Sequence, residues 1–599
     1  MCGITGYVGD RDALPIVAST LANLEYRGYD SAGVALGNAA LDVYKAEGKI
    51  GELTLPDSSA AKTGIGHTRW STHGPPTDAN AHPHTDCTGE IAVVHNGIIE
   101  NHASLRAALE GEHTFTSETD TEVVPHLIEE ELAEGDLRAA VSRVVDRLEG
   151  SYAIAVMVNG REEIVAARQD SPLVIGHGDG EQFLASDVPA FVEHSRDVTF
   201  LEDGDVARIT PAGVEIYRGE ELVERERTHI EWEAEAAEKG GYEHFMLKEI
   251  HEQPRALRQA LTGRVDALSG DVDLDVDLPP EYLQSLEEIQ IVAAGTSYHA
   301  GLYAKQLFEE LADVRVTTHV ASEYEVGGGR DPWQTLVVAI TQSGETADTL
   351  EALRKAKATG ARTMAVTNTV GSTVTREADE TVYIHAGPEI GVAATKTFVS
   401  QVATVTMLAV ALGRFRGELS RERASDVLDS LRSLPGAIQQ VLDREDEIEE
   451  IAAEYADREA FFFLGRQFGY PVALEGALKL KEISYDHAEG FAAGELKHGP
   501  LALVTEEVLV LSVLTAGSRP DATLHNVAEV DTRGAATVGF GEAEGDQSVL
   551  DYAFPVPEAG VLEPVVANVY MQLFAYHVAR LKGRAIDKPR NLAKSVTVQ

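Results

Sequence analysis

Cysteine is nearly absent from this chain: only Cys2 and Cys87 occur among its 599 residues. Two thiols exclude both the disulfide framework of a small secreted domain and a cysteine-rich zinc module. Long apolar runs are missing as well. The longest candidate, residues 399–412, is interrupted by polar side chains and falls short of the roughly 18 residues of a membrane span. The N-terminal residues show neither the basic nor the apolar region of a signal peptide. We therefore expect a cytoplasmic protein with no membrane partner.

Positive charge is also scarce. Fifty Lys and Arg residues stand against 98 Asp and Glu residues, which gives a formal net charge of -48 at pH 7. Such a surface repels nucleic acid and anionic lipid, so neither is expected as a partner. At 1 M salt the Debye length is only ~3 Å, and the self-repulsion of the surface then largely vanishes. With Arg outnumbering Lys by more than two to one, the composition favours a halophilic protein. An ordinary acidic cytosolic enzyme is the alternative.

The pattern of the chain changes from β-rich to alternating. Residues 1–225 contain short strand-like segments punctuated by Gly and Pro. Residues 226–281 are polar and acidic, which predicts a linker. Beyond it, strand patterns alternate with helical ones, which is typical of parallel α/β sheets. We expect two such domains, at residues 282–425 and 454–590, followed by a C-terminal tail at residues 591–599.

The two α/β domains repeat each other. The segment Ser343–Leu350 precedes the similar segment Gly517–Leu524 by 174 residues, and Gly-Ala-x-Thr sequences at 360–363 and 534–537 keep that spacing. Any two doubly wound units share some features. Because these offsets agree, they favour a duplication, and we expect two tandem Rossmann-like, doubly wound domains.

Cys2 becomes the N-terminal residue if Met1 is removed. It then carries a thiol together with an α-amine whose reference pKa is ~7.7–8.0, so the amine can act as the general base for its own thiol. An incidental cysteine is the alternative. Asn96 and Gly97 follow an apolar segment and offer a side-chain amide and a backbone N–H as oxyanion donors. The commoner role of Asn-Gly is a hairpin turn.

Histidine is concentrated in the same part of the chain, with six residues from His67 to His102. Their spacings match no pair of metal ligands on one helix, and no nearby carboxylate clearly completes a site. We therefore expect no metal ion.

Taken together, these residues resemble the class II, or N-terminal nucleophile (Ntn), glutamine amidotransferases. The resemblance is carried by Met1–Ile4, Tyr26–Gly33, Thr68–Trp70, His95–Gly97 and Ser117–Glu122. It implies an N-terminal glutaminase domain with the αββα layers of the Ntn hydrolases.

The same resemblance implies roles for single residues. Cys2 would attack the γ-amide of L-glutamine, and Asn96 with Gly97 would form the oxyanion hole. Arg69 would bind the α-carboxylate of glutamine and Asp120 its α-ammonium group, as a zwitterion requires one group of each charge. The glutamine-binding positions implied in this way are Arg69, Trp70, Thr72, His73, His82 and Asp120.

Hydroxyl-rich segments follow two predicted strands of the first α/β domain. Residues 336–340 run into Thr341–Thr346 and then into a helical pattern, and Gly295–Ser297 follows another strand. Hydroxyl and N–H groups at a helix N-terminus can hold a phosphate. Ordinary N-capping is the alternative for either segment alone. Two such segments in one domain favour a phosphate site.

Three charged residues of the second α/β domain share one helix face. Glu475, Lys479 and Glu482 have the spacing i, i+4 and i+7. A solvated stripe of salt bridges is the usual meaning of this pattern. The surrounding Ala and Leu residues and the following His498-Gly-Pro sequence favour the wall of an active site. Lys594 lies in a basic tail that is unusual in so acidic a chain, with a disordered tail as the alternative.

These segments resemble the paired sugar isomerase (SIS) domains of the isomerizing glutamine–fructose-6-phosphate aminotransferase family. With the glutaminase motifs, the resemblance covers essentially the whole chain. It implies an enzyme that converts L-glutamine and D-fructose 6-phosphate to D-glucosamine 6-phosphate and L-glutamate at the entry to amino-sugar synthesis, as a homodimer or larger homo-oligomer. The positions that would hold the sugar and its phosphate are Thr296, Ser297, Thr341, Gln342, Ser343 and Thr346.

The sugar chemistry is implied by the same resemblance. Lys594 would form a Schiff base with the open-chain ketose, and His498, from this subunit or its neighbour, would assist ring opening. Glu482 would move a proton between C1 and C2 beside Lys479, since this shift needs one base that then serves as acid on the other carbon. The family's usual pattern has cysteine where this chain has Ala294 and serine where it has Thr341, and neither difference removes a catalytic group.

Two alternatives stay open beside this interpretation. Another class II amidotransferase with a different acceptor would need a phosphoribosyltransferase or ATP-pyrophosphatase loop, and the sequence contains neither. A sugar-phosphate sensor built from SIS domains would need only the phosphate-binding segments. The sequence Gly391–Thr397 lacks the glycine spacing of a nucleotide-binding P-loop, and no dinucleotide fingerprint follows a strand, so we expect no cofactor.

Overall fold

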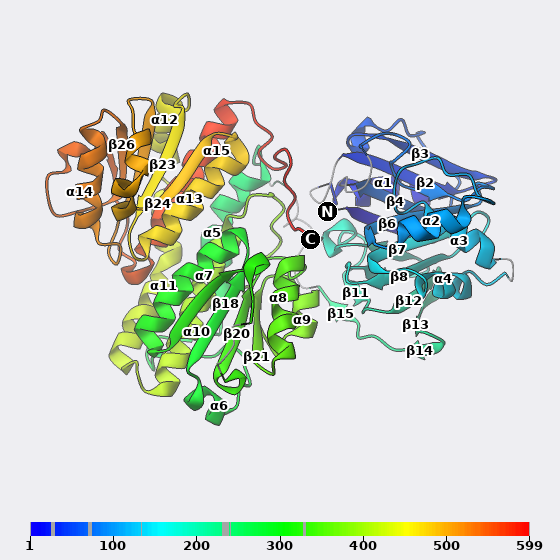
Figure 1. Ribbon diagram of the computed structural model, residues 1–599, viewed down its shortest axis with the longest axis horizontal. Coiled ribbons are helices and arrows are strands. Elements are labelled where there is room, and N and C mark those ends of the chain that lie inside the picture. Colours follow the sequence, from blue (N-terminus) through cyan, green and yellow to red (C-terminus); the bar gives the residue numbers. More distant parts are fainter. Residues whose placement is uncertain are drawn as a thin grey trace. The chain divides into compact units, whose positions relative to one another are not determined.

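The computed structural model describes residues 2–25, 30–69, 75–132, 135–230, 239, 241–326 and 331–597. By its internal contacts the chain forms two compact units. The first contains residues Met1–Ala237 and Ala593–Gln599, and the second contains residues Glu238–Leu592. In Figure 1 the first unit is coloured blue to cyan, with the red end of the chain, and the second green to red.

The first unit contains two antiparallel sheets (Figure 1). One has the strand order β15-β11-β9-β10-β1-β4-β2-β3, formed by β1 (Gly3–Val8), β2 (Ser31–Gly37), β3 (Leu41–Glu47), β4 (Thr63–Arg69), β9 (Val174–His177), β10 (Gln182–Ala185), β11 (Asp197–Phe200) and β15 (Thr228–His229). The other has the order β14-β13-β12-β8-β7-β6-β5, formed by β5 (His84–Thr85), β6 (Ile91–Ile99), β7 (Gly150–Val158), β8 (Ile164–Gln169), β12 (Asp205–Thr210), β13 (Gly213–Arg218) and β14 (Glu221–Val223).

Apolar side chains of the two sheets form a common core, and helices cover their outer faces. Ile4 and Ile65 of the first sheet pack with Val94 and Ala155 of the second. Helix α1 (Ala13–Ala22) packs on β1 and β4. The opposite face of the second sheet is covered by α3 (Val123–Glu131) and α4 (Leu137–Val145), with α2 (His102–Leu109) beside α3. These layers are the αββα architecture expected from the sequence.

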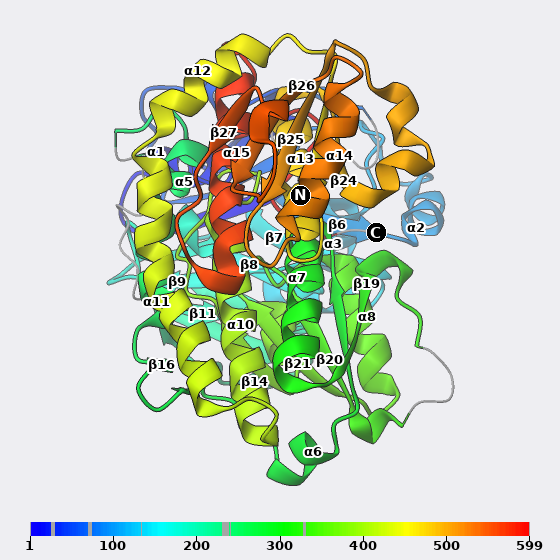
Figure 2. The same ribbon diagram turned by 90° about the vertical axis from the view of Figure 1, so that its left-hand side faces the viewer.

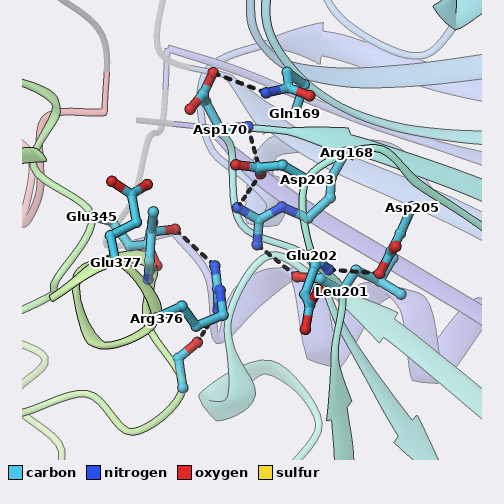
Figure 3. Close-up of polar contacts among 12 residues, drawn as sticks. Arg168, Gln169, Asp170, Leu201, Glu202, Asp203, Asp205, Glu345, Arg376 and Glu377 are labelled. Carbon is cyan, nitrogen blue, oxygen red and sulfur yellow. Dashed lines mark hydrogen bonds and ion pairs between the residues drawn. The ribbon is translucent and has the colours of Figure 1, made fainter. Parts of the chain in front are cut away.

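A buried cation joins β8 to the segment that precedes β12 (Figure 3). Arg168 has a side chain only 1% exposed; its Nη2 lies 2.9 Å from Asp203 Oδ1, and its Nη1 donates to the carbonyl of Leu201 at 2.8 Å. The backbone N–H of Asp170 donates to the same Asp203 oxygen at 2.9 Å. A guanidinium taken this far from water needs such partners, so Arg168 fixes the local path of the chain.

The second unit contains two five-stranded parallel sheets with the same topology. The first has the order β19-β18-β20-β21-β22 and the second the order β24-β23-β25-β26-β27, and each is therefore 2-1-3-4-5 within its repeat. The strands of the first are β18 (Glu288–Ala293), β19 (Arg315–Val320), β20 (Thr335–Ile340), β21 (Arg362–Thr367) and β22 (Glu380–Tyr383). Those of the second are β23 (Ala460–Gly465), β24 (His487–Ala492), β25 (Val508–Leu514), β26 (Ala536–Gly541) and β27 (Tyr552–Phe554).

Helices pack around both sheets and between them. In Figure 2, α10 lies beside α7, α13 beside α15 and α11 beside α5. The helices are α5 (Phe245–Leu261), α6 (Pro280–Ser285), α7 (Gly295–Ala312), α8 (Ala347–Ala358), α9 (Thr373–Glu377), α10 (Lys396–Arg416), α11 (Arg421–Leu442), α12 (Glu445–Tyr455), α13 (Gly469–Ser484), α14 (Pro520–Asp531) and α15 (Glu563–Leu581). A short hairpin of β16 (Val265–Asp266) and β17 (Asp271–Val272) follows α5.

Helix α10 is long and apolar enough to cross a membrane by length and composition alone. Within the second unit, 78% of its apolar window is buried, and it packs against α5, α7 and α11. Its residues Phe398, Val402 and Val405 are wholly enclosed in the core that the two repeats share. In the sequence this run is interrupted by polar residues, so no membrane span was expected. Several of these, such as Thr404 and Thr406, bond to the carbonyl four residues earlier.

The expected linker at residues 226–281 is wrong for most of its length. Its beginning forms β15, an edge strand of the first unit, and its middle forms α5. Met246, Ile250 and Leu257 of α5 are completely buried in the core of the second unit. Their spacing of i, i+4 and i+11 places them on one face, but the high charge of the segment obscured this face in the sequence.

Candidate active sites

Cys2 immediately precedes β1, a central strand of the first sheet. Because Gly3 pairs with Thr68 of the antiparallel neighbour β4, the next pair outward is Cys2 opposite Arg69. Arg69 is buried, and burial lowers its pKa, although Cys2 and the carboxylates of Asp120 and Asp30 act against this shift. The structure therefore brings together the expected nucleophile and the two residues expected to bind the charged ends of glutamine.

Asn96 and Gly97 lie in the middle of strand β6, not in a turn, so the hairpin alternative is wrong. The side-chain amide of Asn96 donates to the carbonyl of Cys2 at 3.1 Å. Gly97 has φ +124°, and a Cβ at this position would stand 2.1 Å from the carbonyl oxygen of Ser151 on β7. Only glycine fits such a backbone, so the close approach of β7 fixes the position of Gly97.

His67 orients the Asn96 amide. Its Nε2 lies 2.9 Å from the carbonyl of His95 and 3.1 Å from Asn96 Oδ1. Both partners accept, so we assign the proton to Nε2. Burial lowers the pKa of His67 to about 3, which keeps the ring neutral. Because Oδ1 of Asn96 is held by this donor, its NH₂ group is directed to Cys2.

No role of its own was expected for His67. A signal was available: His67 lies two residues before Arg69 in one strand, and residues at i and i+2 share a face of a sheet. The bond to Asn96 could not be foreseen, because it joins strands of the two different sheets.

Asp120 and His82 are both buried around the same strands. Asp120 accepts the backbone N–H of Ile99, at the end of β6, at 2.9 Å. His82 stacks on His67 with 4.2 Å between ring centroids and accepts the N–H of His95 at 3.3 Å. Burial, with smaller effects of the neighbouring imidazoles, lowers the pKa of His82 well below its usual value. The other expected glutamine-site residues, Trp70, Thr72 and His73, lie outside the described residues.

In the second unit, both hydroxyl-rich segments leave the first parallel sheet at the same edge. Strands β18 and β20 are neighbours, and their last residues Ala293 and Ile340 are paired in register. Gly295–Ser297 begins α7, and Thr341–Thr346 leads into α8. In a 2-1-3-4-5 sheet this is the point where strand order reverses, and ligands bind there at the carboxyl ends of the strands.

The segment Thr341–Thr346 is held in a tight turn. Gly344 has φ +70°, and a Cβ there would stand 2.1 Å from Ser372 Oγ. Its N–H donates to Thr341 Oγ1 at 3.2 Å, and the N–H of Glu345 donates to Ser343 Oγ at 3.2 Å. The turn leaves Gln342 and Ser343 half-buried, while Thr341 is buried.

Glu345 fastens this turn to helix α9. Its carboxylate accepts the N–H of Thr373 at 2.8 Å. Arg376, also drawn in Figure 3, donates to Thr373 Oγ1 at 2.9 Å. No sequence motif pointed to these residues, whose hydrogen bonds hold the turn against α9.

Helix α13 carries the three charged residues on a buried face. The side chains of Glu475 and Lys479 are 0% and 1% exposed, and Lys479 Nζ lies 3.4 Å from Glu475 Oε1 and 2.7 Å from Glu482 Oε2. A solvated stripe is therefore not what the structure shows. Burial opposes the charge of Lys479, but the two carboxylates outweigh it and raise its pKa. Burial also opposes ionisation of Glu475, yet Lys479 and His299 hold the pKa of this carboxyl below its usual range.

Helix α7 of the first repeat meets this charged face. Thr296 Oγ1 donates to Glu475 at 2.9 Å and accepts from Lys479 at 3.1 Å. His299 Nδ1 bonds to the other Glu475 oxygen at 2.7 Å. Ser297, next in the chain, accepts from Gln401 of α10 at 2.9 Å. The expected sugar-binding hydroxyl of Thr296 and the expected catalytic face thus form one network.

His498 and Lys594, also expected to act on the sugar, lie in two other segments. His498 ends the short 3₁₀ helix η7 (Ala493–His498), where it is exposed. Lys594 is half-buried in the C-terminal segment that belongs to the first unit.

The comparisons with known proteins cover both units. The glutamine amidotransferase domain model matches residues 67–193, and the SIS domain model matches residues 282–411 and 454–581. The chain is 60% identical to the isomerizing glutamine–fructose-6-phosphate aminotransferase of Halobacterium salinarum and 50% identical to that of Symbiobacterium thermophilum, in both cases over all of each chain. The source of the first relative, Halobacterium salinarum, is consistent with the halophilic composition of this chain.

A solved structure supports the second unit. The C-terminal domain of the glucosamine-fructose-6-phosphate aminotransferase of Francisella tularensis is 37% identical, with a TM-score of 0.56. The similarity covers 59% of this chain and 99% of that one. With a glutaminase-type first unit and two SIS domains in the second, the chain belongs to the isomerizing glutamine–fructose-6-phosphate aminotransferase family.

Proposed function

We propose that the chain transfers the amide nitrogen of L-glutamine to D-fructose 6-phosphate and isomerises the product. The products are D-glucosamine 6-phosphate and L-glutamate, at the first step of amino-sugar (UDP-GlcNAc) synthesis. The similarity to aminotransferases of this name over the whole chain carries the proposal. The buried ion cluster on α13 favours an enzyme over a sugar-phosphate sensor, because binding a phosphate does not require a lysine enclosed between two carboxylates.

Glutamine hydrolysis is assigned to the first unit. With Met1 removed, the α-amine of Cys2 takes the thiol proton, and the sulfur attacks the γ-amide carbon. The oxyanion is stabilised by Asn96 Nδ2 and the N–H of Gly97, each worth about 3 kcal/mol in a site of this kind. Ammonia leaves, and water then hydrolyses the thioester to glutamate. Arg69 and Asp120 hold the α-carboxylate and α-ammonium, and the remaining contacts come from Trp70, Thr72, His73 and His82.

The sugar reaction is assigned to the second unit and the C-terminal segment. The phosphate and hydroxyls of the sugar bind to Thr296, Ser297, Thr341, Gln342, Ser343 and Thr346. His498 assists ring opening, and the amine of Lys594 adds to the C2 carbonyl and releases water to form an imine. Ammonia displaces Lys594 from C2. Glu482 then takes a proton from C1 and returns it to C2, which makes the aldose.

Lys479 is a positioning residue in this scheme. Its raised pKa keeps it charged beside Glu482, so it holds the carboxylate in place and is a poor nucleophile. This leaves Lys594 as the amine for imine formation. We further propose a cytoplasmic homodimer or larger homo-oligomer in which the exposed His498 serves the site of a second copy. No cofactor is needed for these steps.

The reaction is tested by product analysis in molar KCl, with amide-¹⁵N glutamine and fructose 6-phosphate supplied together. Wild type is expected to form ¹⁵N-glucosamine 6-phosphate, and Cys2→Ala to form none. Lys594→Arg is expected to hydrolyse glutamine without forming amino sugar, whereas Lys588→Arg, six residues earlier, retains both activities. Glutamate release by wild type without labelled amino sugar would refute the acceptor. Binding of fructose 6-phosphate without any turnover would favour the sensor.

A further inference from the structure

A second cluster of reactive side chains lies in the first unit, apart from the residues assigned to glutamine. It contains Cys87, in the segment between β5 and β6, His113, between α2 and α3, and His126 and Glu129 on α3. One ligand atom from each of these four residues lies within 4.8 Å of all the others. The residues are up to 42 positions apart, so only the fold brings them together.

The distances within this cluster agree with coordination of one ion. Cys87 Sγ lies 3.5 Å from His113 Nδ1 and 3.6 Å from His126 Nδ1. Glu129 Oε2 lies 3.2 Å from His113 Nδ1 and 3.6 Å from His126 Nδ1. Four ligands at zinc distances of about 2.0–2.3 Å, arranged as a tetrahedron, stand about 3.3–3.6 Å from one another. These four contacts fit the edges of such a tetrahedron.

The backbone N–H of Cys87 donates to Glu129 Oε2 at 3.1 Å, but this bond leaves the thiol and the two imidazole Nδ1 atoms without an assigned partner. Two imidazole Nδ1 atoms face the same sulfur and the same carboxylate oxygen, while a thiol has one proton to give. His113 Nε2 lies 3.6 Å from Glu130 Oε1. A proton on Nε2 is favoured by this carboxylate, so Nδ1 presents a lone pair to the centre of the cluster. A cation at the centre would satisfy all the converging lone pairs at once.

The surroundings of the cluster resemble the outer shell of a metal site. A carboxylate behind a ligating histidine, as Glu130 is behind His113, fixes the orientation of the ring. The backbone N–H of Thr114 points at Cys87 Sγ at 3.5 Å. Asp86 accepts the N–H groups of Glu90 and Ile91 at 2.9 and 2.8 Å and so shapes the turn that presents Cys87.

We propose that Cys87, His113, His126 and Glu129 bind one divalent transition-metal ion, with Zn²⁺ as the occupant. Thiolate and imidazole ligands suit zinc and disfavour Ca²⁺ and Mg²⁺, which take oxygen ligands. Four protein ligands fill a tetrahedron and leave no open position, so the ion has a structural role. It fastens three segments together, and His113 and His126 lie on either side of the segment that carries Asp120. This site departs from the expectation of no metal, which was based on the histidines from His67 to His102.

Cobalt provides the direct test, because a Co²⁺–thiolate bond gives an intense near-ultraviolet charge-transfer band. In full-length Cys2→Ala, Cys87 is the only remaining thiol. After bound zinc has been removed with a chelator and the chelator dialysed away, titration of this variant with Co²⁺ in molar KCl is expected to produce the band at about one equivalent. Cys2→Ala/Cys87→Ala is expected to show none. Absence of the band in folded Cys2→Ala would overturn the proposal without requiring any ligand variant to fold.

Zinc content gives the second measurement. Wild type dialysed against molar KCl is expected to retain about one zinc per chain. Cys87→Ala and His126→Ala are expected to retain at least about tenfold less zinc. His229→Ala removes an exposed imidazole that pairs with Asp197 and serves as the control for non-specific binding to an acidic surface. Chelation is expected to lower the Tm of wild type and of His229→Ala. It should leave the Tm of Cys87→Ala and His126→Ala unchanged. Equal zinc in all four proteins would overturn the proposal. None of these readouts depends on glutamine or sugar turnover.

Discussion

Helices α7 and α13 occupy the same place in the two repeats of the second unit, yet their charged residues have opposite surroundings. Lys305 and Lys479 lie 174 residues apart, the spacing at which the repeats match. Lys305 forms an i,i+4 pair with Glu309 at 3.8 Å, with side chains 40% and 42% exposed. Lys479 forms its i,i+4 pair with Glu475 in the core, where both are shielded from water.

This difference shows that the two repeats contribute different groups to the proposed sugar site. The first repeat contributes the hydroxyl-rich turn at Thr341–Thr346 and the hydroxyl of Thr296. The second contributes the buried ion cluster, and its own equivalent turn is closed on itself: Ser518 Oγ is buried, accepts the N–H of Thr515 at 2.9 Å and donates to the Thr515 carbonyl at 2.6 Å. We therefore expect binding of the sugar phosphate to depend on the first repeat and proton transfer to depend on the second.

The largest expected difference is in stability. Lys479→Met leaves the buried carboxylate of Glu475 and the partly buried carboxylate of Glu482 without their shared cation, and we expect the free energy of unfolding to fall by about 3–5 kcal/mol. Lys305→Met removes an exposed pair worth about 0.3–0.5 kcal/mol. Calorimetric unfolding in molar KCl measures both. Equal Tm shifts for the two variants would show that the α13 cluster is not buried as described.

Substitutions on the same two helices should also differ in their effect on the reaction rate. Glu482→Gln cannot move the proton between C1 and C2, and we expect glucosamine 6-phosphate formation to fall about 10²–10⁴-fold. Glutamine hydrolysis in the first unit should remain. Glu309→Gln, on the exposed face of α7, should leave both rates unchanged. An undiminished rate of amino-sugar formation in Glu482→Gln would remove this residue from the mechanism.

At low pH the stability difference between wild type and a variant of the α13 cluster should decrease. Glu475→Gln weakens the cluster but leaves Lys479 paired with Glu482, so at pH 7 we expect a smaller loss, about 1–3 kcal/mol. Because the pKa of Glu475 is lowered in the folded state, its contribution is complete above the unfolded pKa of about 4.3 and is lost as pH falls through the folded value. The Tm difference from wild type should therefore shrink below about pH 4. A difference that stays constant from pH 7 to pH 3 contradicts an ionised Glu475.

The smallest effect concerns the two equivalent turns. Ser343→Ala removes a half-buried hydroxyl from the expected phosphate site, and we expect the KM for fructose 6-phosphate to rise about tenfold, equivalent to 1.4 kcal/mol. Ser518→Ala should lower the Tm slightly and leave this KM unchanged. Initial-rate kinetics distinguish the two, and a rise in KM with Ser518→Ala alone would reverse the assignment of the repeats.

Much of this architecture could be predicted from local patterns. The repeat spacing predicted two domains of one topology, and the i, i+4, i+7 spacing placed Glu475, Lys479 and Glu482 on one face. The surrounding Ala and Leu residues favoured an active-site wall over a solvated stripe, but the groups that enclose this face could not be predicted, since Lys305 has a similar i,i+4 partner and is exposed. The surroundings are set by Thr296 and His299, which are more than 170 residues away from Glu475.

Contacts between distant segments explain the other failures. The bond from His67 to Asn96 joins two sheets, and Cys87 meets residues 26 and 39 positions further along. No periodicity within one segment contains such information. The high charge of residues 226–281 led to the wrong prediction of a linker, because the apolar face of α5 is not apparent among the charged residues.

The most direct test of the division between the repeats is an experimental structure with glucosamine 6-phosphate bound in molar KCl. We predict the phosphate on the turn Thr341–Thr346 and the C1 and C2 atoms within hydrogen-bonding reach of Glu482. A sugar phosphate bound instead at the turn containing Thr515 and Ser518, away from the α13 cluster, would contradict the account.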